Sequence, residues 1–432
     1  MGGFLLFLIL VMLFFTTYYY FSGLISPSVQ LIGMFLVGCF CYIMFSQTWE
    51  ADLSFNTIFV VSSTLIMFSL GEAVSKRTKI IDISFGKRNR YVCIDCDTIR
   101  NNIFIIKNCY FIVLTILSAV ILYFYYKYTM KLSAAAGNIY GFSRMINFAY
   151  NAKNNLSDMP DEPSYVTLGL VISRCFAYYC IFITTFNAIV KHRKLGNLKY
   201  FIPIMLYLAQ ALLASGRTQL LRFCIHYLIT FMVLQENISI RKKIQAKTFF
   251  KIIAVAVLFL AAYRAYGIWR GSLHTDMVEI LSYPAAPLQA LNLYLDNPKY
   301  SDVFGGETLV TIRSILRKIG IDSPNLPLSL SAIRWSNGST NIYTAIRRYI
   351  ADYYIVGMFI IVFILGFFYG YLKKWMLQNG QLVSLIIYAM LIYPVIEFLF
   401  EERFFIGVLS AGTLYYLICV LLMKRIIRLI PR

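Results

Sequence analysis

The chain has 432 residues, of which 59% are hydrophobic and 17% are aromatic, and its mean hydropathy is +0.68. A soluble domain is about 45–50% apolar, so this composition excludes a soluble globular protein. The formal net charge is +20, but the basic residues gather in short segments between apolar runs, which argues against a nucleic-acid partner.

Eleven apolar runs follow one another along the chain, and they are continuously apolar rather than alternating. A helix crosses a bilayer with about 20 apolar residues, and only helices or closed barrels satisfy the backbone in lipid. We therefore predict an all-α polytopic membrane protein with about 11 transmembrane helices (10–12), forming a single membrane domain over residues 1–432. The predicted spans are residues 4–22, 29–47, 55–72, 108–127, 165–190, 200–214, 218–235, 250–268, 353–372, 381–398 and 404–423.

Lysine and arginine are distributed unevenly between these spans. Segments 73–107, 191–199, 236–251, 373–380 and 424–432 hold 8, 4, 5, 2 and 4 of them, which is 23 of the chain's 40. The alternate short segments 48–54, 131–163, 216–218 and 399–403 hold 0, 3, 1 and 1. By the positive-inside rule, the basic segments and the C-terminus are cytoplasmic and the N-terminus lies outside. The first run has no preceding Lys or Arg, so we expect a retained helix rather than a signal peptide.

Two longer segments face outward in this topology. Segment 131–163 is polar and aromatic, and segment 269–350 joins the eighth and ninth spans. A connection of that length usually carries function or its own structure. Within it, a Gly-Gly turn at 305–306 precedes a helical apolar pattern, and prolines and glycine punctuate the rest. We expect a large outward loop, partly helical, lying on the membrane surface.

Several arginines are expected on or near the outer side. They are Arg217, Arg222, Arg264, Arg270, Arg334 and Arg403. A guanidinium donates two parallel hydrogen bonds to a phosphate, so a cluster of arginines suits a phosphorylated lipid. The alternative is that each anchors at lipid headgroups or pairs with Glu397, Glu401 or Glu402. Arg217 is the best candidate, because it follows Gly216 in a tight turn with little loop to solvate it.

The histidines offer one candidate for a general base. His226 follows Arg222 by one helical turn on the seventh predicted span, where a buried, hydrogen-bonded histidine is favoured over a catalyst. His274 lies four residues after Arg270 and is the only histidine in an outward segment. It is therefore the best histidine candidate for general base catalysis, with a surface histidine as the alternative.

Several classes are excluded by missing motifs. The chain has no GxxxxGK[ST], HExxH or GxSxG. A lone CxxC at Cys93 and Cys96 and a lone DxD at Asp95 and Asp97 lie in a basic inward segment, and we interpret both as chance. No acidic cluster suggests an outward metal site, so no metal or other cofactor is expected.

Segment 339–372 reads STNIYTAIRRYIADYYIVGMFIIVFILGFFYGYL. It resembles the Wzy-type O-antigen polymerases, which join oligosaccharide repeat units. The matching residues are Asn341, Tyr343 and Thr344 for an Asn–hydrophobic–Tyr–Thr element, then Tyr349, Asp352, Tyr353 and Gly357 for an aromatic–Asp–aromatic–Gly–x–x–Gly element. Tyr354 departs from the pattern, since the family often has Gly there. The SGR at 215–217 is a second match.

The resemblance implies transfer of a growing glycan from undecaprenyl diphosphate onto the non-reducing sugar of a new lipid-linked unit. This takes place at the periplasmic face of the bacterial inner membrane, and a chain-length regulator and a flippase are expected partners. Preorganised arginines would stabilise the departing diphosphate without metal.

The predicted roles follow from that reaction. Arg217 leads as the diphosphate ligand, assisted by Arg270 and by Arg222 or Arg334. His274 is the first candidate for the base, with Glu307 or Asp276 behind it. Trp335 and Tyr343 are candidates for stacking on sugar rings, and Asp352 for orienting an arginine or capping the ninth span.

Two other functions remain open. An O-antigen ligase uses the same leaving group and has a similar late outward loop. A flippase for the same lipid belongs to another class, but transporters usually show internal repeats and broken helices, and we detect no repeat.

Overall fold

The structure is a computed structural model. It describes residues 1–79, 102–138, 141–155, 162–189, 195–214, 217–238, 281–321, 330–379 and 382–431. Within these ranges, six helices are long and apolar enough to cross a membrane. They are α1 (Gly2–Phe21), α2 (Pro27–Ser46), α3 (Phe55–Arg77), α5 (Asn108–Ala135), α7 (Ser164–Ile189) and α14 (Ala345–Asn379).

The other described elements are shorter or more polar. The helices are α6 (Met145–Asn155), α8 (Phe201–Leu213), α9 (Arg217–Ile238), α12 (Ala286–Asp296), α13 (Val310–Lys318), α15 (Leu382–Leu391), α16 (Tyr393–Glu397) and α17 (Ala411–Met423). Single helical turns are η1 (Gly141–Arg144), η2 (Leu195–Tyr200), η3 (Phe404–Val408, a π turn) and η4 (Lys424–Ile426), and the strands are β1 (Asn102–Ile106), β2 (Ile333–Trp335), β3 (Gly338–Thr340) and β4 (Ile427–Pro431).

The mainly helical structure with little sheet agrees with the predicted all-α membrane class, but it does not confirm 11 spans. The run predicted at 353–372 lies within α14, which begins at Ala345 and has a kink at Tyr354, where the backbone is not helical. The run predicted at 381–398 is interrupted at Ile392, between α15 and α16, where Pro394 has no amide hydrogen to continue the helix. The run predicted at 250–268 lies outside the described residues.

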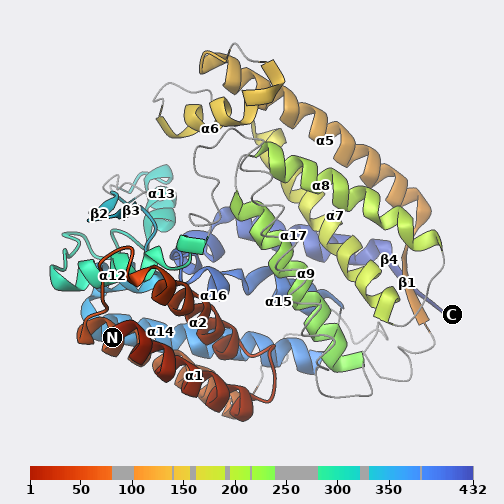
Figure 1. Cartoon of the computed structure of the whole chain (residues 1–432). Helices are drawn as coiled ribbons and strands as arrows, with labels where there is room; N and C mark the ends of the chain where they lie inside the picture. Colours follow the sequence, from red (N-terminus) through yellow and green to blue (C-terminus); the bar gives the residue numbers. More distant parts are fainter. Residues whose placement is uncertain are drawn as a thin grey trace. The chain divides into compact units, whose positions relative to one another are not determined.

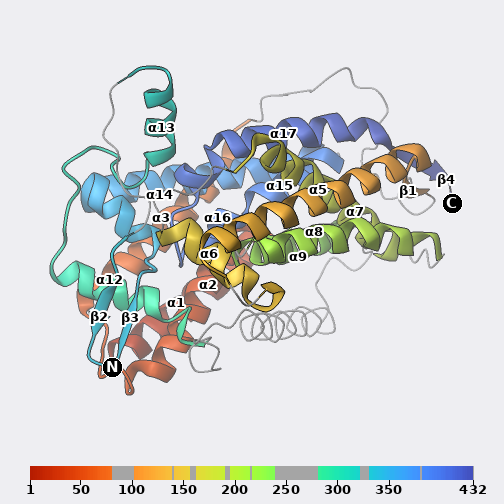
Figure 2. The ribbon, with the colours of Figure 1, turned by 90° about the horizontal axis from the view of Figure 1, so that it is seen from above.

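The chain divides into two compact units. Unit 1 comprises Met1–Lys87, Val278–Asn379 and Leu391–Thr413. Its helices α1, α2, α3 and α14 lie side by side (Figures 1 and 2). The α3–α14 contact is close because glycines meet backbone: a Cβ added at Gly71 would lie 2.1 Å from the Phe363 carbonyl oxygen.

Unit 1 also contains the described part of the predicted outward loop. From residue 281 this part has helices α12 and α13 and an antiparallel hairpin, β2–β3, with Ile333 opposite Thr340. The loop is thus partly helical, as predicted; residues 269–280 and 322–329 lie outside the described residues.

Unit 2 comprises Arg88–Met277, Gly380–Met390 and Leu414–Arg432. Helices α5, α7, α8 and α9 pack together in it (Figure 1). Strands β1 and β4 pair antiparallel. The buried Asn187 side chain bonds the backbone of Phe104 in β1, accepting from its N–H at 3.2 Å and donating to its carbonyl at 3.1 Å, which ties β1 to α7.

Candidate functional site

The largest group of interacting charged side chains in the described residues lies in unit 1. It is built by the first turns of α14, the turn before α13, and the connection between α16 and η3. We call it the charged network. Its charged members are Glu307, Arg347, Arg348, Asp352, Glu397, Glu401, Glu402 and Arg403.

Asp352 fixes the turn that presents Glu307. Its carboxylate accepts the backbone N–H of Glu307 at 3.0 Å and that of Thr308 at 2.8 Å, and the Thr308 hydroxyl at 2.7 Å. Asp352 is only 7% exposed, and these donors offset the cost of burying its charge. The Asp352 carboxylate is thus engaged by the turn at Glu307 and Thr308, and it does not act as the predicted cap of the ninth span.

Arg347 is the central cation of the network. It forms an ion pair with Glu307. Its guanidinium also lies over two rings, 5.1 Å from the centroid of Tyr294 and 4.9 Å from that of Tyr343. A guanidinium between aromatic faces is favoured electrostatically. This arrangement holds Arg347 in one orientation with its pairing edge toward Glu307.

Arg348 holds the same turn from the other side. Its Nη1 donates to the Glu307 carbonyl oxygen at 3.1 Å, and its Nη2 lies 3.6 Å from Glu401 Oε1. Glu401 also pairs with Arg403, whose Nε is 3.6 Å from Glu397 Oε2. The arginines of the network are therefore matched by carboxylates, so an incoming anion has to displace one of these acids.

Glu402 anchors the rear of the network. Its buried carboxylate accepts the N–H groups of Phe404 at 2.7 Å, Phe405 at 2.8 Å and Ile406 at 3.1 Å. The Tyr349 hydroxyl donates to it at 3.0 Å. Burial raises the pKa of Glu402, and these hydrogen bonds oppose the rise. Its partners are all internal, so its role is to hold η3 against α14.

Glu307 is the carboxylate best placed to react. Its side chain is 20% exposed and that of Glu401 is 30% exposed, whereas Asp352 and Glu402 are buried; of the two exposed acids, Glu307 is the one paired with the ring-stacked Arg347. Burial raises the pKa of Glu307, and the nearby charges of Arg347 and Arg348 oppose that rise. A partly exposed carboxylate with a raised pKa is a reasonable proton acceptor.

The predicted aromatic residues are partly covered by protein. Tyr343 is buried, its hydroxyl donates to the Ser331 carbonyl at 2.8 Å, and one ring face is occupied by Arg347. Trp335 packs edge-on against Trp49, with ring centroids 5.3 Å apart. Tyr343 therefore does not offer both ring faces to a sugar, and Trp335 is half-buried. Arg334 precedes Trp335 on β2 and is exposed.

The other predicted residues belong to unit 2 or lie outside the described residues. Arg217 begins α9, and its side chain is not described. Arg222 is half-buried one turn further along α9. Arg270, His274 and Asp276, together with Arg264, lie outside the described residues. The predicted convergence of these arginines therefore remains a prediction.

In unit 2, the half-buried Arg174 lies among polar aromatic residues. Arg174 Nε donates to the Tyr207 hydroxyl at 2.9 Å, its Nη2 contacts Gln219, and its guanidinium lies 4.6 Å from the Tyr416 ring centroid. These contacts solvate the cation inside α7. His226 is buried, as predicted, and stacks on Tyr178 at 3.8 Å, which favours a packing role.

Arg347 and Arg348 were not among the predicted site residues. The ninth span was predicted to begin at residue 353, which left both arginines in a loop. The signal was an adjacent pair of arginines inside the segment that resembles the O-antigen polymerases. Among the described residues, no group of three or more His, Cys, Asp or Glu is arranged to hold a metal ion.

No protein-family model matches this chain, and neither a curated protein nor a solved structure matches it.

Proposed function

We propose that this chain is a polysaccharide polymerase of the inner membrane, joining undecaprenyl-diphosphate-linked oligosaccharide units at the periplasmic face. The support comes from the composition of the charged network. Three residues of the segment that resembles the O-antigen polymerases, Tyr343, Tyr349 and Asp352, contact its members directly. Through Asp352, that segment also positions Glu307 of the preceding loop. The motif residues hold together a partly buried cluster of acids and arginines. A catalytic or binding role explains such a cluster better than anchoring of the arginines at lipid headgroups does.

The proposal keeps the finer topology of the sequence analysis. It includes 11 spans in a single membrane domain and residues 269–350 as the large periplasmic loop. It also includes a chain-length regulator and a flippase as partners, and catalysis without a metal or another cofactor.

The reaction needs a base and cations for the leaving group. The acceptor hydroxyl oxygen bonds to the donor's anomeric carbon, the bond from that carbon to the diphosphate breaks, and the diphosphate leaves with the electron pair. Glu307 takes the hydroxyl proton in this proposal. A diphosphate that binds Arg347 competes with the Glu307 carboxylate, and its binding frees that carboxylate to act as base.

The predicted residues of the sequence analysis remain rivals within the same function. Arg217 is still the leading diphosphate ligand on sequence grounds, with Arg222, Arg270 and Arg334 behind it, and His274 and Asp276 are rivals to Glu307. Single substitutions distinguish the candidate bases. Substituting the base itself should lower polymer formation more than substituting a residue that only lines the site.

The first experiment is the lipopolysaccharide gel of a deletion strain complemented with the wild-type gene. Loss of a polymerase leaves lipopolysaccharide with a single repeat unit, whereas loss of a ligase leaves none attached. Purified protein mixed with lipid-linked repeat units and no energy source should form polymer. The absence of polymer there, with normal protein folding, would support a transporter instead.

The second experiment replaces the proposed base. Glu307→Gln keeps the side-chain size and the backbone contact to Asp352, and should lower polymer formation by about 10²–10⁴-fold. Glu50→Gln is the matched control, because Glu50 is an exposed acid outside the network. If the Glu307→Gln variant makes long polysaccharide at matched expression, the base lies elsewhere. The His274→Ala variant, assayed in parallel, then tests the next candidate.

The pH dependence gives a further readout on the same base. Glu307 accepts a proton only when ionised, and burial raises its pKa. Activity of the purified protein should therefore be lost on acidification at a higher pH than an ordinary glutamate would give. A rate that is unchanged across that acidic range would argue against Glu307.

A further inference from the structure

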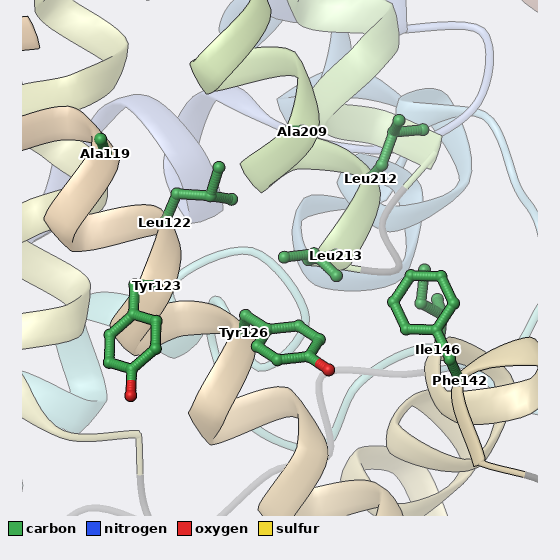
Figure 3. A pocket seen from close by; sticks show the side chains of 9 residues that line it. All are labelled: Ala119, Leu122, Tyr123, Tyr126, Phe142, Ile146, Ala209, Leu212 and Leu213. Carbon is green, nitrogen blue, oxygen red and sulfur yellow. The ribbon is translucent and has the colours of Figure 1, made fainter.

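Unit 2 has an open apolar pocket between α5, η1–α6 and α8, with a volume of about 440 Å³. Side chains from α5 and α8 face each other across it, and Phe142 and Ile146 close a third side (Figure 3). The only polar atoms of its lining side chains are the hydroxyls of Tyr123 and Tyr126. Pockets of about 300–1,000 Å³ commonly bind ligands, and an apolar cavity is a poor place for water.

The pocket is continuous with a surface that faces hydrocarbon in a membrane. Helix α5 is one of the six candidate spans, and much of its apolar surface is exposed, including Ile116 and Val120. Tyr123 and Phe142, which line the pocket, are themselves exposed. A hydrocarbon chain can therefore enter sideways from the bilayer without crossing a polar barrier.

The rim of the pocket is basic. Lys127 lies one turn beyond Tyr123, with its Nζ 5.8 Å from that ring's centroid, and Lys131 follows one turn later. Arg144 lies between Phe142 and Ile146. All three cations are exposed. Residues 102–155 contain five Lys or Arg and no Asp or Glu.

We propose that this pocket binds one acyl chain of an anionic phospholipid, with the phosphate against Lys127, Lys131 and Arg144. The apolar interior accounts for the chain, and the basic rim selects the anionic headgroup, since each basic residue near a membrane surface contributes attraction to anionic lipid. The occupant is thus an amphiphile with a single negative end, and the site is independent of the proposed sugar transfer.

The test is native mass spectrometry of the delipidated full chain with added phosphatidylglycerol or phosphatidylcholine of identical acyl chains. Phosphatidylglycerol should bind with one tight site, and phosphatidylcholine should bind more weakly. Lys127→Gln and Arg144→Gln should each weaken phosphatidylglycerol binding by about fivefold. Lys107→Gln, at the other end of α5, is the matched control and should leave binding unchanged.

The acyl-chain half of the proposal is tested by filling the pocket. Ala209→Trp should abolish the tight site, whereas Met205→Trp should not, because Met205 lies on the same helix but is 62% exposed and does not line the pocket. If Ala209→Trp fails to fold, Ala119→Phe fills the pocket from α5 instead. Equal binding of the two lipids would overturn the headgroup assignment, and full binding by a folded, filled variant would overturn the pocket.

Discussion

At the scale of single residues, Tyr354 carries the clearest conflict between side chain and backbone. It has φ 58° and ψ 178° in the middle of α14, a region occupied almost only by glycine and costing about 1–3 kcal/mol for other residues. Its ring is 62% exposed and lies 4.5 Å from the Tyr300 ring. The residue at which the sequence departs from the pattern used in the sequence analysis is thus also one whose backbone conformation favours glycine.

Because of this conflict, we expect glycine to be more stabilising than alanine at position 354, the reverse of their order in a regular helix. In a regular helix, Gly is about 1 kcal/mol less favourable than Ala, but at position 354 Tyr354→Gly should be more stable than Tyr354→Ala, because only Gly tolerates the positive φ. Both substitutions remove the Tyr300 contact, so their comparison isolates the backbone. The measurement is the midpoint of thermal unfolding of the purified chain in detergent. An equal or higher midpoint for Tyr354→Ala would mean that the kink carries no strain.

Three residues of the sequence analysis lie in or against the charged network. Asp352 and Glu307 are members of it, and Tyr343 contacts its Arg347. The partner of Asp352 was not predictable, because its carboxylate contacts backbone amides 44 and 45 residues earlier in the chain. Spacing along one helix indicates which residues share a face, but it does not indicate which distant loop that face meets.

At the scale of elements, the tightest packing is that of α3 against α14. A Cβ added at Gly366 would lie 2.0 Å from the Phe68 carbonyl oxygen, which is backbone and unable to move aside. Small residues allow helices to approach this closely in a membrane. Nearby, the buried Glu72 carboxylate accepts from Ser26 Oγ at 2.8 Å and lies 3.4 Å from Lys373 Nζ, which fixes the same pair of helices.

Gly366→Ala should therefore destabilise the protein although alanine favours helices. Overpacking costs about 1–3 kcal/mol, which exceeds the about 1 kcal/mol that alanine gains over glycine in a helix. The matched control is Gly33→Ala in α2, where an added Cβ would meet Phe14 at an ordinary 3.5 Å. Thermal unfolding of both variants in detergent is the measurement. A Gly366→Ala variant as stable as Gly33→Ala would show that α3 and α14 separate at little cost.

Hydrophobic runs predicted the helices better than they predicted the ends. The run at 55–72 corresponds to α3, which continues to Arg77, and the run at 353–372 corresponds to part of α14. Hydropathy shows only where the chain is apolar. A helix ends where its backbone hydrogen bonds end, which can be several residues beyond the apolar run. The break at Ile392 was not predicted, because hydropathy indicated one continuous run at 381–398, whereas the structure has α15 and the short α16 there.

At the scale of the whole molecule, charge is the main predictor of orientation in the membrane. The basic segments 73–107, 191–199, 236–251, 373–380 and 424–432 are predicted inside, and the short segments 48–54, 131–163, 216–218 and 399–403, which are poor in Lys and Arg, are predicted outside. Helix α3 ends with Lys76 and Arg77, and α5 begins just after Lys107. The prediction places the end of α3 in the cytoplasm and the end of α5 at the periplasmic face, the side on which sugar transfer is proposed.

Labelling of single cysteines tests this orientation. In a background lacking the nine native cysteines, Ala135→Cys at the end of α5 should react with a membrane-impermeant maleimide in intact spheroplasts. Arg77→Cys at the end of α3 should react only after the membrane is permeabilised. Both positions are exposed at helix ends, so reactivity differs only through the side of the membrane. The reverse labelling pattern would invert the topology, move segment 269–350 to the cytoplasm and remove the charged network from the lipid-linked units it is proposed to join.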